Sequence, residues 1–185
     1  MQSNGLRTPF TATLRRLGIQ PTRFLVGIDV ARQRFTLWEQ APRRTGRFPT
    51  YKLFAQAPAS TSRFGIGQVQ DSNKTPLGLH RIAQKIGAGF PQGTVFRGRK
   101  PVGFTWKGLP EAPIVHRIFW LEGLEPGFNR GDGVDSFQRY IYIHGFSDET
   151  TLGQPASHGC IHVAAEHLIP LHDWLPLGTL VWIHE

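Results

Sequence analysis

Short runs of β-branched and aromatic residues, bordered by Gly, Pro or Asn, recur along most of this 185-residue chain. Such runs favour β-strands, and their turn-forming borders keep each strand short. The runs cover residues 23–30, 34–39, 49–55, 78–84, 114–121, 139–144 and 179–184. The 21 Gly and 14 Pro are typical of many turns rather than of a helical bundle. The sequence therefore predicts a mainly β, sheet-based fold.

One helix is predicted, over residues 164–175. Leu168, Leu171 and Leu175 recur there at three- and four-residue spacing, which is the period of one helix face. Pro170 lies in the middle of the segment and is expected to kink or split the helix.

Composition limits the organisation of the chain. With 39% hydrophobic and 18% charged residues, it suits one folded domain and not a disordered protein. Residues 1–22 carry Arg7, Arg15 and Arg16 without an acidic residue, and we expect a flexible basic arm there before a single domain over residues 23–185. No apolar run is long enough to span a membrane, and no secretion-signal pattern is seen. We therefore expect a cytoplasmic location, or a periplasmic one if the natural N-terminus lies upstream.

Charge is divided unevenly along the sequence. Residues 1–107 hold 18 Lys and Arg against three acidic residues, whereas residues 108–185 hold three against ten. A basic half of this kind indicates either an anionic partner or a solvated basic surface.

The chemically informative segment is 139–163, which holds the only Cys and three of the eight His. A Cys acts as a nucleophile only as a thiolate, and a nearby base must draw off its proton. His144 ends a predicted strand in which Tyr140, Tyr142 and His144 share one face, and it lies 16 residues before Cys160. Gly159 allows close backbone approach, so that amides beside Cys160 could receive an oxyanion.

Two other interpretations compete with catalysis. A single Cys is more often a small buried hydrophobic residue than a nucleophile. His158, Cys160 and His162 also alternate as three possible metal ligands would along an extended strand. The metal interpretation has no second motif to support it.

The spaced motifs resemble those of the L,D-transpeptidase (YkuD-type) catalytic domain. The family's His-Gly pair followed by Ser/Thr-His-Gly-Cys corresponds to His144-Gly145 and to residues 157–160. Its Thr-Pro-x-Gly turn matches residues 75–78, and its Pro-x-Gly-Thr-x-Val-x-Ile ending matches residues 176–183. The resemblance covers about residues 23–184 and implies a β-sandwich of mixed sheets with one or two short helices.

The resemblance also implies the roles of individual residues. Cys160 would be the nucleophile, His144 the base, and the Gly145 carbonyl the group that orients the imidazole. Ser157, His158 and Gly159 would support the oxyanion site. The substrate would be a peptidoglycan tetrapeptide stem or muropeptide, cleaved between the L-centre of its diamino acid and D-Ala. No metal and no cofactor is implied.

One position departs from the family pattern. The family usually has Arg two residues after the Cys, where this sequence has His162. We expect His162 to contact the substrate and to replace the guanidinium partly when protonated, which would favour activity at lower pH.

The acceptor is predicted from two loops. Residues 78–101 and 117–145 resemble signal-less members of the family that act as L,D-carboxypeptidases in muropeptide recycling. Water is therefore the expected acceptor, and transpeptidation to an amine or exchange with a D-amino acid is the alternative. A more distant alternative is a nucleic-acid-binding module, because residues 96–100 (FRGRK) mix an aromatic with basic residues. We do not expect a nucleic-acid partner.

Overall fold

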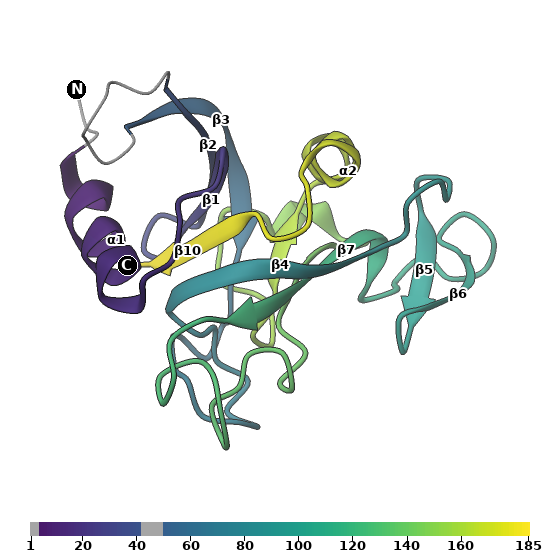
Figure 1. Ribbon diagram of the computed structural model, residues 1–185. Coiled ribbons are helices and arrows are strands. Elements are labelled where there is room, and N and C mark those ends of the chain that lie inside the picture. The colour runs from purple at the N-terminus through teal and green to yellow at the C-terminus, as the bar shows by residue number, and fades with distance from the viewer. Residues whose placement is uncertain (1–3, 42–49) are drawn as a thin grey trace.

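The computed structural model describes residues 4–41 and 50–185, and a mixed β-sheet dominates them (Figure 1). The strands of this described part are β1 (Phe24–Asp29), β2 (Arg34–Gln40), β3 (Tyr51–Ser60), β4 (Gly78–Ile86), β5 (Thr94–Arg97), β6 (Lys100–Phe104), β7 (Val115–Gly123), β8 (Tyr142–Gly145), β9 (Ile161–Val163) and β10 (Leu180–His184). The helices are α1 (Asn4–Leu17), the 3-10 turn η1 (Glu149–Thr151) and α2 (Ala165–Trp174). The predicted mainly β fold is thus confirmed.

The strands form one sheet in the order β4-β10-β1-β2-β3-β9-β8-β7-β5-β6. An additional pairing joins β4 to β7, so the sheet closes on itself and its inner face encloses a core. The β1–β10 and β8–β9 pairs are parallel and the others antiparallel, which makes the sheet mixed, as predicted. The β5–β6 hairpin stands beside β7, outside the closed part (Figure 1).

Most predicted strands are present, with shifted ends. Pro49, at the start of one predicted run, lies outside the described residues. The run at 139–144 pairs only from Tyr142, because Tyr140 has φ +57° and the backbone turns there. Strands β5, β6 and β9 were not predicted. β9 has three residues, too few for an alternating pattern to be recognised.

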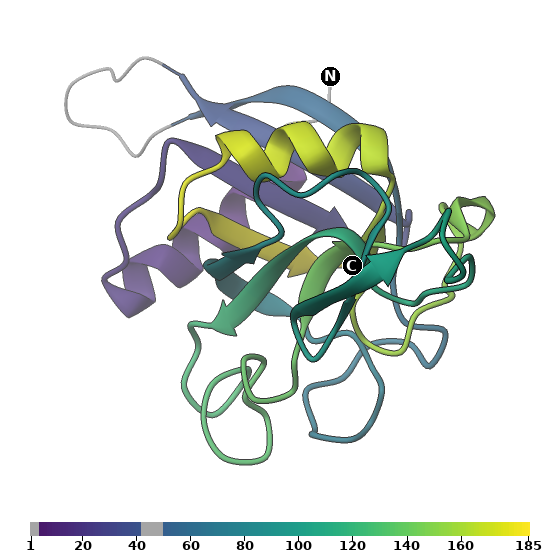
Figure 2. The same ribbon diagram turned by 90° about the vertical axis from the view of Figure 1, so that its right-hand side faces the viewer.

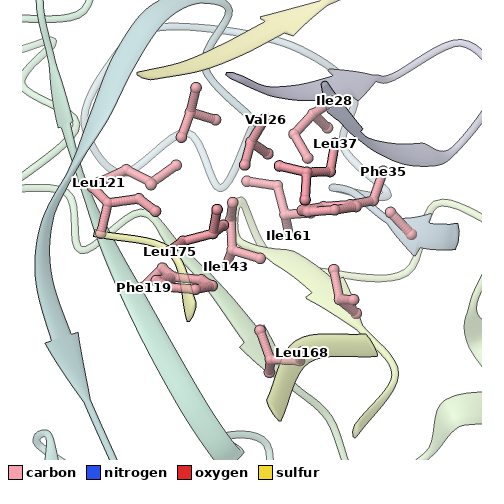
Figure 3. Close-up of a cluster of buried hydrophobic side chains, with 14 of the residues drawn as sticks. Val26, Ile28, Phe35, Leu37, Phe119, Leu121, Ile143, Ile161, Leu168 and Leu175 are labelled. Carbon is pink, nitrogen blue, oxygen red and sulfur yellow. The ribbon is translucent and has the colours of Figure 1, made fainter. Parts of the chain in front are cut away.

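The main core lies inside the closed sheet (Figure 3). Inward side chains from β1, β2, β7, β8 and β9 meet there, and Phe35, Phe119, Ile143 and Ile161 are fully buried among them. Burial of a large apolar side chain stabilises a fold by about 1.5–3 kcal/mol. This core fixes β8 and β9, which carry the candidate site on their opposite face.

Helix α2 covers one end of this core, where Leu168 and Leu175 are buried (Figures 2 and 3). The predicted helix is therefore present, and Pro170 does not split it. The Glu149 carboxylate accepts the Ala165 N–H at 2.7 Å and so satisfies a free donor at the helix start.

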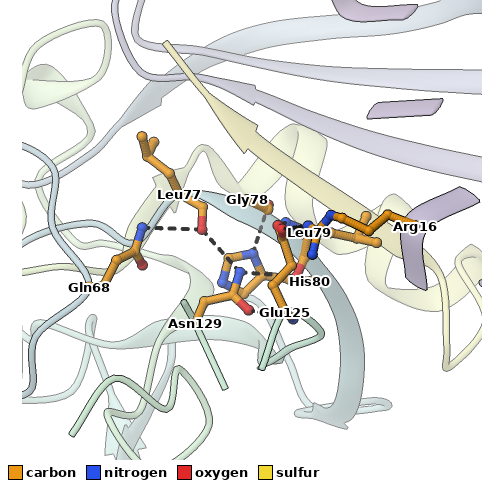
Figure 4. Close-up of polar contacts among 8 residues, drawn as sticks. All are labelled: Arg16, Gln68, Leu77, Gly78, Leu79, His80, Glu125 and Asn129. Carbon is orange, nitrogen blue, oxygen red and sulfur yellow. Dashed lines mark hydrogen bonds and ion pairs between the residues drawn. The ribbon is translucent and has the colours of Figure 1, made fainter. Parts of the chain in front are cut away.

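The segment before residue 23 differs from the expected flexible arm. Helix α1 buries Phe10 and Leu14 against Leu180 and Trp182 on the outer face of the sheet. Arg16 binds the buried Glu125 carboxylate, which also accepts the Leu79 N–H (Figure 4). These two apolar residues, four apart on the helix, pack it against the sheet. The helix is hard to recognise in the sequence, because it contains Pro9 and has no acidic residue in its first turn.

No helix of the described residues is long and apolar enough to cross a membrane.

Candidate active site

Strands β8 and β9 bring together the predicted catalytic residues. Their parallel register pairs Ile143 with Ile161 and His144 with His162. Because side chains alternate along a strand, the two isoleucines enter the core and the histidines face the other way. Cys160, two residues before His162, packs with Tyr142 on this outer face. The sheet therefore places Cys160 and His144 on one surface, two residues apart in register.

The tautomer of His144 follows from one hydrogen bond. Its Nδ1 lies 2.8 Å from the Gly145 carbonyl oxygen. A carbonyl only accepts, so Nδ1 carries the proton and Nε2 keeps its lone pair. Burial lowers the pKa of His144 to about 4 and outweighs the Gly145 bond, which raises it. The imidazole is consequently neutral near pH 7, with one nitrogen free to accept a proton.

Gly145 has no room for a side chain. A Cβ at this position would lie 2.4 Å from the His116 ring and 2.7 Å from the Val115 carbonyl oxygen. His116 adopts φ +69°, a strained backbone conformation, at an irregularity in the β7–β8 pairing. The Gly93 N–H donates to its Nδ1 at 2.7 Å and fixes the ring. His116 and Gly145 together therefore set the position of the carbonyl that orients His144.

Cys160 is held as a neutral thiol. Its Sγ donates to the Tyr140 carbonyl oxygen at 3.4 Å. The residue is partly exposed, yet the protein atoms around its sulfur raise the pKa of the thiol to about 11 by burial. A backbone hydrogen bond from Tyr142 and the charge of Arg139 act in the opposite direction and favour the thiolate. With a neutral thiol beside a neutral imidazole, proton transfer must accompany attack on a substrate.

The turn before the cysteine is closed by its own side chains. The Ser157 hydroxyl donates to the Cys160 carbonyl oxygen at 2.5 Å and accepts the Gly159 N–H at 3.2 Å. Gly159 has φ +118°, a conformation that favours glycine. Because its amide is already bonded, Gly159 is a weaker oxyanion donor than the sequence suggested.

The loop over residues 62–75 supports this turn. Thr75 donates its hydroxyl to the Gly159 carbonyl at 3.1 Å and accepts the Ser62 N–H at 2.9 Å. Ser62 also forms a bridge with Ser157. The Thr-Pro-x-Gly turn of the sequence thus contacts the cysteine loop directly.

Arg139 joins the same loop to the site. Its guanidinium donates to the carbonyls of Gly67 (3.2 Å), Gln68 (2.8 Å) and Lys74 (2.7 Å), and to the Ser72 hydroxyl at 3.5 Å. Its charge also lowers the pKa of Cys160. Sequence reasoning missed Arg139 and His116 and gave Thr75 no role beyond its turn motif, because their partners lie tens of residues away along the chain.

The two remaining predicted histidines differ in burial. His158 is exposed and its Nε2 lies 2.6 Å from the Arg63 guanidinium, at the rim of the site. His162 is buried, stacks on Phe146 at 4.5 Å, and lies 4.8 Å from the His144 ring. Its Nδ1 is buried without a hydrogen-bond partner.

Burial is also the main reason why the pKa of His162 falls to about 3, and the neighbouring His144 and His158 lower it further. This disagrees with the expectation that a protonated His162 replaces the missing guanidinium, because the ring is neutral near pH 7. Sequence reasoning could not foresee this, since the burial arises from Phe146 and from strand pairing.

The metal and nucleic-acid interpretations find no supporting feature in the described residues. In the part of the chain that is described, no group of three His, Cys, Asp or Glu is placed to hold a metal ion. Phe96, the aromatic residue of the basic segment 96–100, is 3% exposed and cannot stack on a nucleobase.

Comparisons with known proteins agree with this fold and identify the family. The model of the L,D-transpeptidase (YkuD) catalytic domain matches residues 24–183. Bd1075 of Bdellovibrio bacteriovorus is similar in fold, with TM-score 0.56 and 16% identity over 88% of this chain and 48% of that protein. An L,D-transpeptidase of Enterococcus faecium gives TM-score 0.50 and 15% identity over 89% and 50%. The chain thus spans about half of each of these structures, and no curated protein matches it. Since the family model matches most of its length, the chain belongs to the L,D-transpeptidase catalytic domain family.

Proposed function

We propose that the protein is a cysteine acyl-enzyme that cleaves peptidoglycan tetrapeptide stems between the L-centre of the diamino acid and D-Ala, with water as the acceptor. The observation that carries this proposal is the hydrogen bond between His144 Nδ1 and the Gly145 carbonyl. It leaves Nε2 as a base on the surface that also presents Cys160. A nucleophile, its base and a group that orients the base are the minimum for covalent acyl transfer.

The first half-reaction forms a thioester. As the Cys160 sulfur attacks the scissile carbonyl, its proton passes to His144 Nε2, and the Gly145 carbonyl stabilises the imidazolium through Nδ1–H. The carbonyl oxygen becomes an oxyanion, to which we assign the Cys160 amide as donor, because the Ser157 hydroxyl already accepts the Gly159 N–H. The C–N bond then breaks, the imidazolium returns its proton to the amine, and D-Ala leaves.

The second half-reaction releases the product. His144 removes a proton from water, the hydroxide attacks the thioester, and the C–S bond breaks to give the shortened peptide and the free thiol. An amine in place of water would give transpeptidation by the same steps. The segments 78–101 and 117–145 resemble those of carboxypeptidase-like members, which supports water as the acceptor.

Mass analysis of a purified muropeptide tetrapeptide incubated with the enzyme tests this proposal. We expect a product lighter by one D-Ala, both with and without an added D-amino acid. Exchange of the terminal residue for the added D-amino acid would instead favour transfer.

The matched control is Cys160→Ala, which removes only the thiol sulfur. It should form neither product. If the variant still releases D-Ala, the acyl-enzyme mechanism is wrong.

A further inference from the structure

The turn of the β5–β6 hairpin places an arginine in a strained conformation near the candidate site. Arg97 pairs with Lys100, so Gly98 and Arg99 form a two-residue turn with φ +53° and +67°. Turns of this type favour Asn and Gly, because the left-handed conformation costs other residues about 1–2 kcal/mol. An arginine that occupies such a position indicates a role for its side chain.

The Arg99 side chain lies over a group of aromatic rings. Its guanidinium carbon lies 4.6 Å from the centre of the Trp120 ring and 5.3 Å from that of Tyr140, and one nitrogen donates to the Tyr142 hydroxyl at 3.4 Å. Stacking of this kind fixes the plane of a guanidinium while it leaves most of its N–H donors unused.

The same aromatic rings lead directly to the nucleophile. Tyr142 packs with Cys160 in one cluster, and its backbone forms a hydrogen bond with the sulfur. The Tyr140 carbonyl accepts from the Cys160 thiol at 3.4 Å. One aromatic residue therefore separates the Arg99 guanidinium from the attacking atom.

Arg99 also has unused donors, unlike the other two arginines near the site. Arg139 already makes four hydrogen bonds to the 62–75 loop, and Arg63 is paired with His158. No acidic side chain of residues 4–41 and 50–185 forms an ion pair with Arg99, whose side chain is half-exposed. His162, at the position where a cation was expected, is neutral and buried.

We propose that Arg99 binds a carboxylate of the peptide substrate beside Cys160 and thereby selects the substrate. This inference rests on the proposed function. A peptide that ends one residue beyond the attacked carbonyl carries its terminal carboxylate about 4 Å away, since consecutive residues are 3.8 Å apart. A diamino acid with a second carboxylate offers the same chemistry, and a planar guanidinium can bind either group with two N–H donors.

The first test is Arg99→Asn, because Asn tolerates the left-handed turn and lacks the guanidinium. With a free-acid tetrapeptide we expect KM to rise about tenfold while kcat changes less than twofold. The KM of Arg99→Lys should lie between those of wild type and Arg99→Asn, because lysine keeps the charge but lacks the planar guanidinium. Arg97→Ala and Lys100→Ala remove the same charge from the same turn, and should shift KM less than twofold.

Two altered substrates identify the carboxylate. If Arg99 binds the terminal group, Arg99→Asn has no effect on a peptide that ends in a carboxamide. If it binds the second carboxylate of the diamino acid, the effect persists with the carboxamide and disappears when lysine replaces that residue. Either pattern supports the proposal. An effect retained with both altered peptides, or an Arg99→Asn variant that behaves like Arg97→Ala, overturns it.

Binding without turnover separates this inference from the proposed function. Calorimetric titration of Cys160→Ala should show about tenfold tighter binding of the carboxylate peptide than of its neutral analogue, and Arg99→Asn in that background should remove the difference. If wild-type enzyme cleaves no peptide but this difference is present, the proposed function fails and the Arg99 site stands. If the peptide is cleaved but the difference is absent, Arg99 is not the carboxylate site.

Discussion

Arg139 acts on Cys160 through its charge, Arg99 contacts Tyr140 and Tyr142 beside it, and the protein holds these two arginines in different ways. Arg139 is half-buried and bonded to three carbonyls and a hydroxyl of the 62–75 loop. Arg99 stands on an exposed turn, against aromatic rings, with a single 3.4 Å hydrogen bond. The protein itself supplies the hydrogen-bond acceptors of Arg139, whereas most donors of Arg99 remain available to a ligand. We call β8, β9 and the 62–75 loop the fixed side of the site, and the β5–β6 hairpin the hairpin side. The fixed side therefore positions the catalytic residues, whereas the hairpin side selects the substrate.

The largest expected effect is on the fixed side, from Gly145→Ala. The added Cβ would overlap the His116 ring and displace the carbonyl that orients His144. We expect acylation to slow about 100-fold, because a misplaced base loses most of the rate acceleration that comes from its orientation. Single-turnover release of D-Ala measures the rate. A rate within threefold of wild type would show that the Gly145 carbonyl does not control His144.

Arg139→Ala should disturb both stability and rate. It leaves three carbonyls without their charged donor and frees the loop that supports Gly159 through Thr75. We expect the free energy of unfolding to fall by about 2 kcal/mol, with a lower kcat. Urea unfolding followed by circular dichroism provides the first value. An Arg139→Ala variant as stable as Arg99→Asn would remove the contrast between the two arginines.

The pH profile tests the neutral imidazole of the fixed side. Burial lowers the pKa of His144 to about 4, and burial with the neighbouring histidines lowers that of His162 to about 3. The base is therefore competent above pH 4, and we expect kcat/KM to be constant from about pH 5 to 9 and to fall about tenfold per unit below pH 4. A rate that rises between pH 7 and 5 would instead restore a protonated His162 as a substrate contact.

The stability of the protein should be measured over the same pH range, because His144 and His162 also affect folding. Both histidines have folded pKa values below the unfolded value of 6.5, so their contribution to stability is complete above pH 6.5 and is lost as the pH falls through 4. Unfolding midpoints between pH 7 and 4 should decrease, and rates should be compared only where the protein is folded.

The smallest expected effect is that of Arg99→Asn on stability. The side chain makes one long, partly buried hydrogen bond, and the replacement suits the turn. We expect the free energy of unfolding to stay within about 0.5 kcal/mol of wild type or to rise slightly. Thermal unfolding measures the change. A loss of 2 kcal/mol would assign Arg99 to the framework of the fold rather than to the hairpin side of the site.

The local parts of the fold were predictable from the sequence. Alternation in residues 139–144 placed Ile141 and Ile143 on the face opposite Tyr142 and His144, and the core confirms this. The β5–β6 hairpin was not predicted, because its turn looked like a basic motif and not like Asn-Gly. Helix α1 was missed because its stability comes from distant contacts with Leu180 and Trp182.

The candidate site, like the fold, was predictable only in its local parts. The spaced motif named Cys160, His144 and Gly145, and the structure brings them onto one surface. Arg139 and Arg99 act through partners 21–72 residues away, which no local pattern encodes. The state of His162 depended on burial, and burial at that position follows from strand pairing rather than from the residue itself.

The central claim is that Cys160 forms a covalent acyl intermediate, and the mass of the intact enzyme tests it most directly. Cys160 is the only cysteine, so an adduct on a thiol can belong to no other residue. Acid quenching of wild-type enzyme during turnover of a tetrapeptide should show an added mass equal to the substrate minus alanine, located on the peptide that contains Cys160. Turnover without such an adduct, or an adduct that persists in Cys160→Ala, would contradict the account.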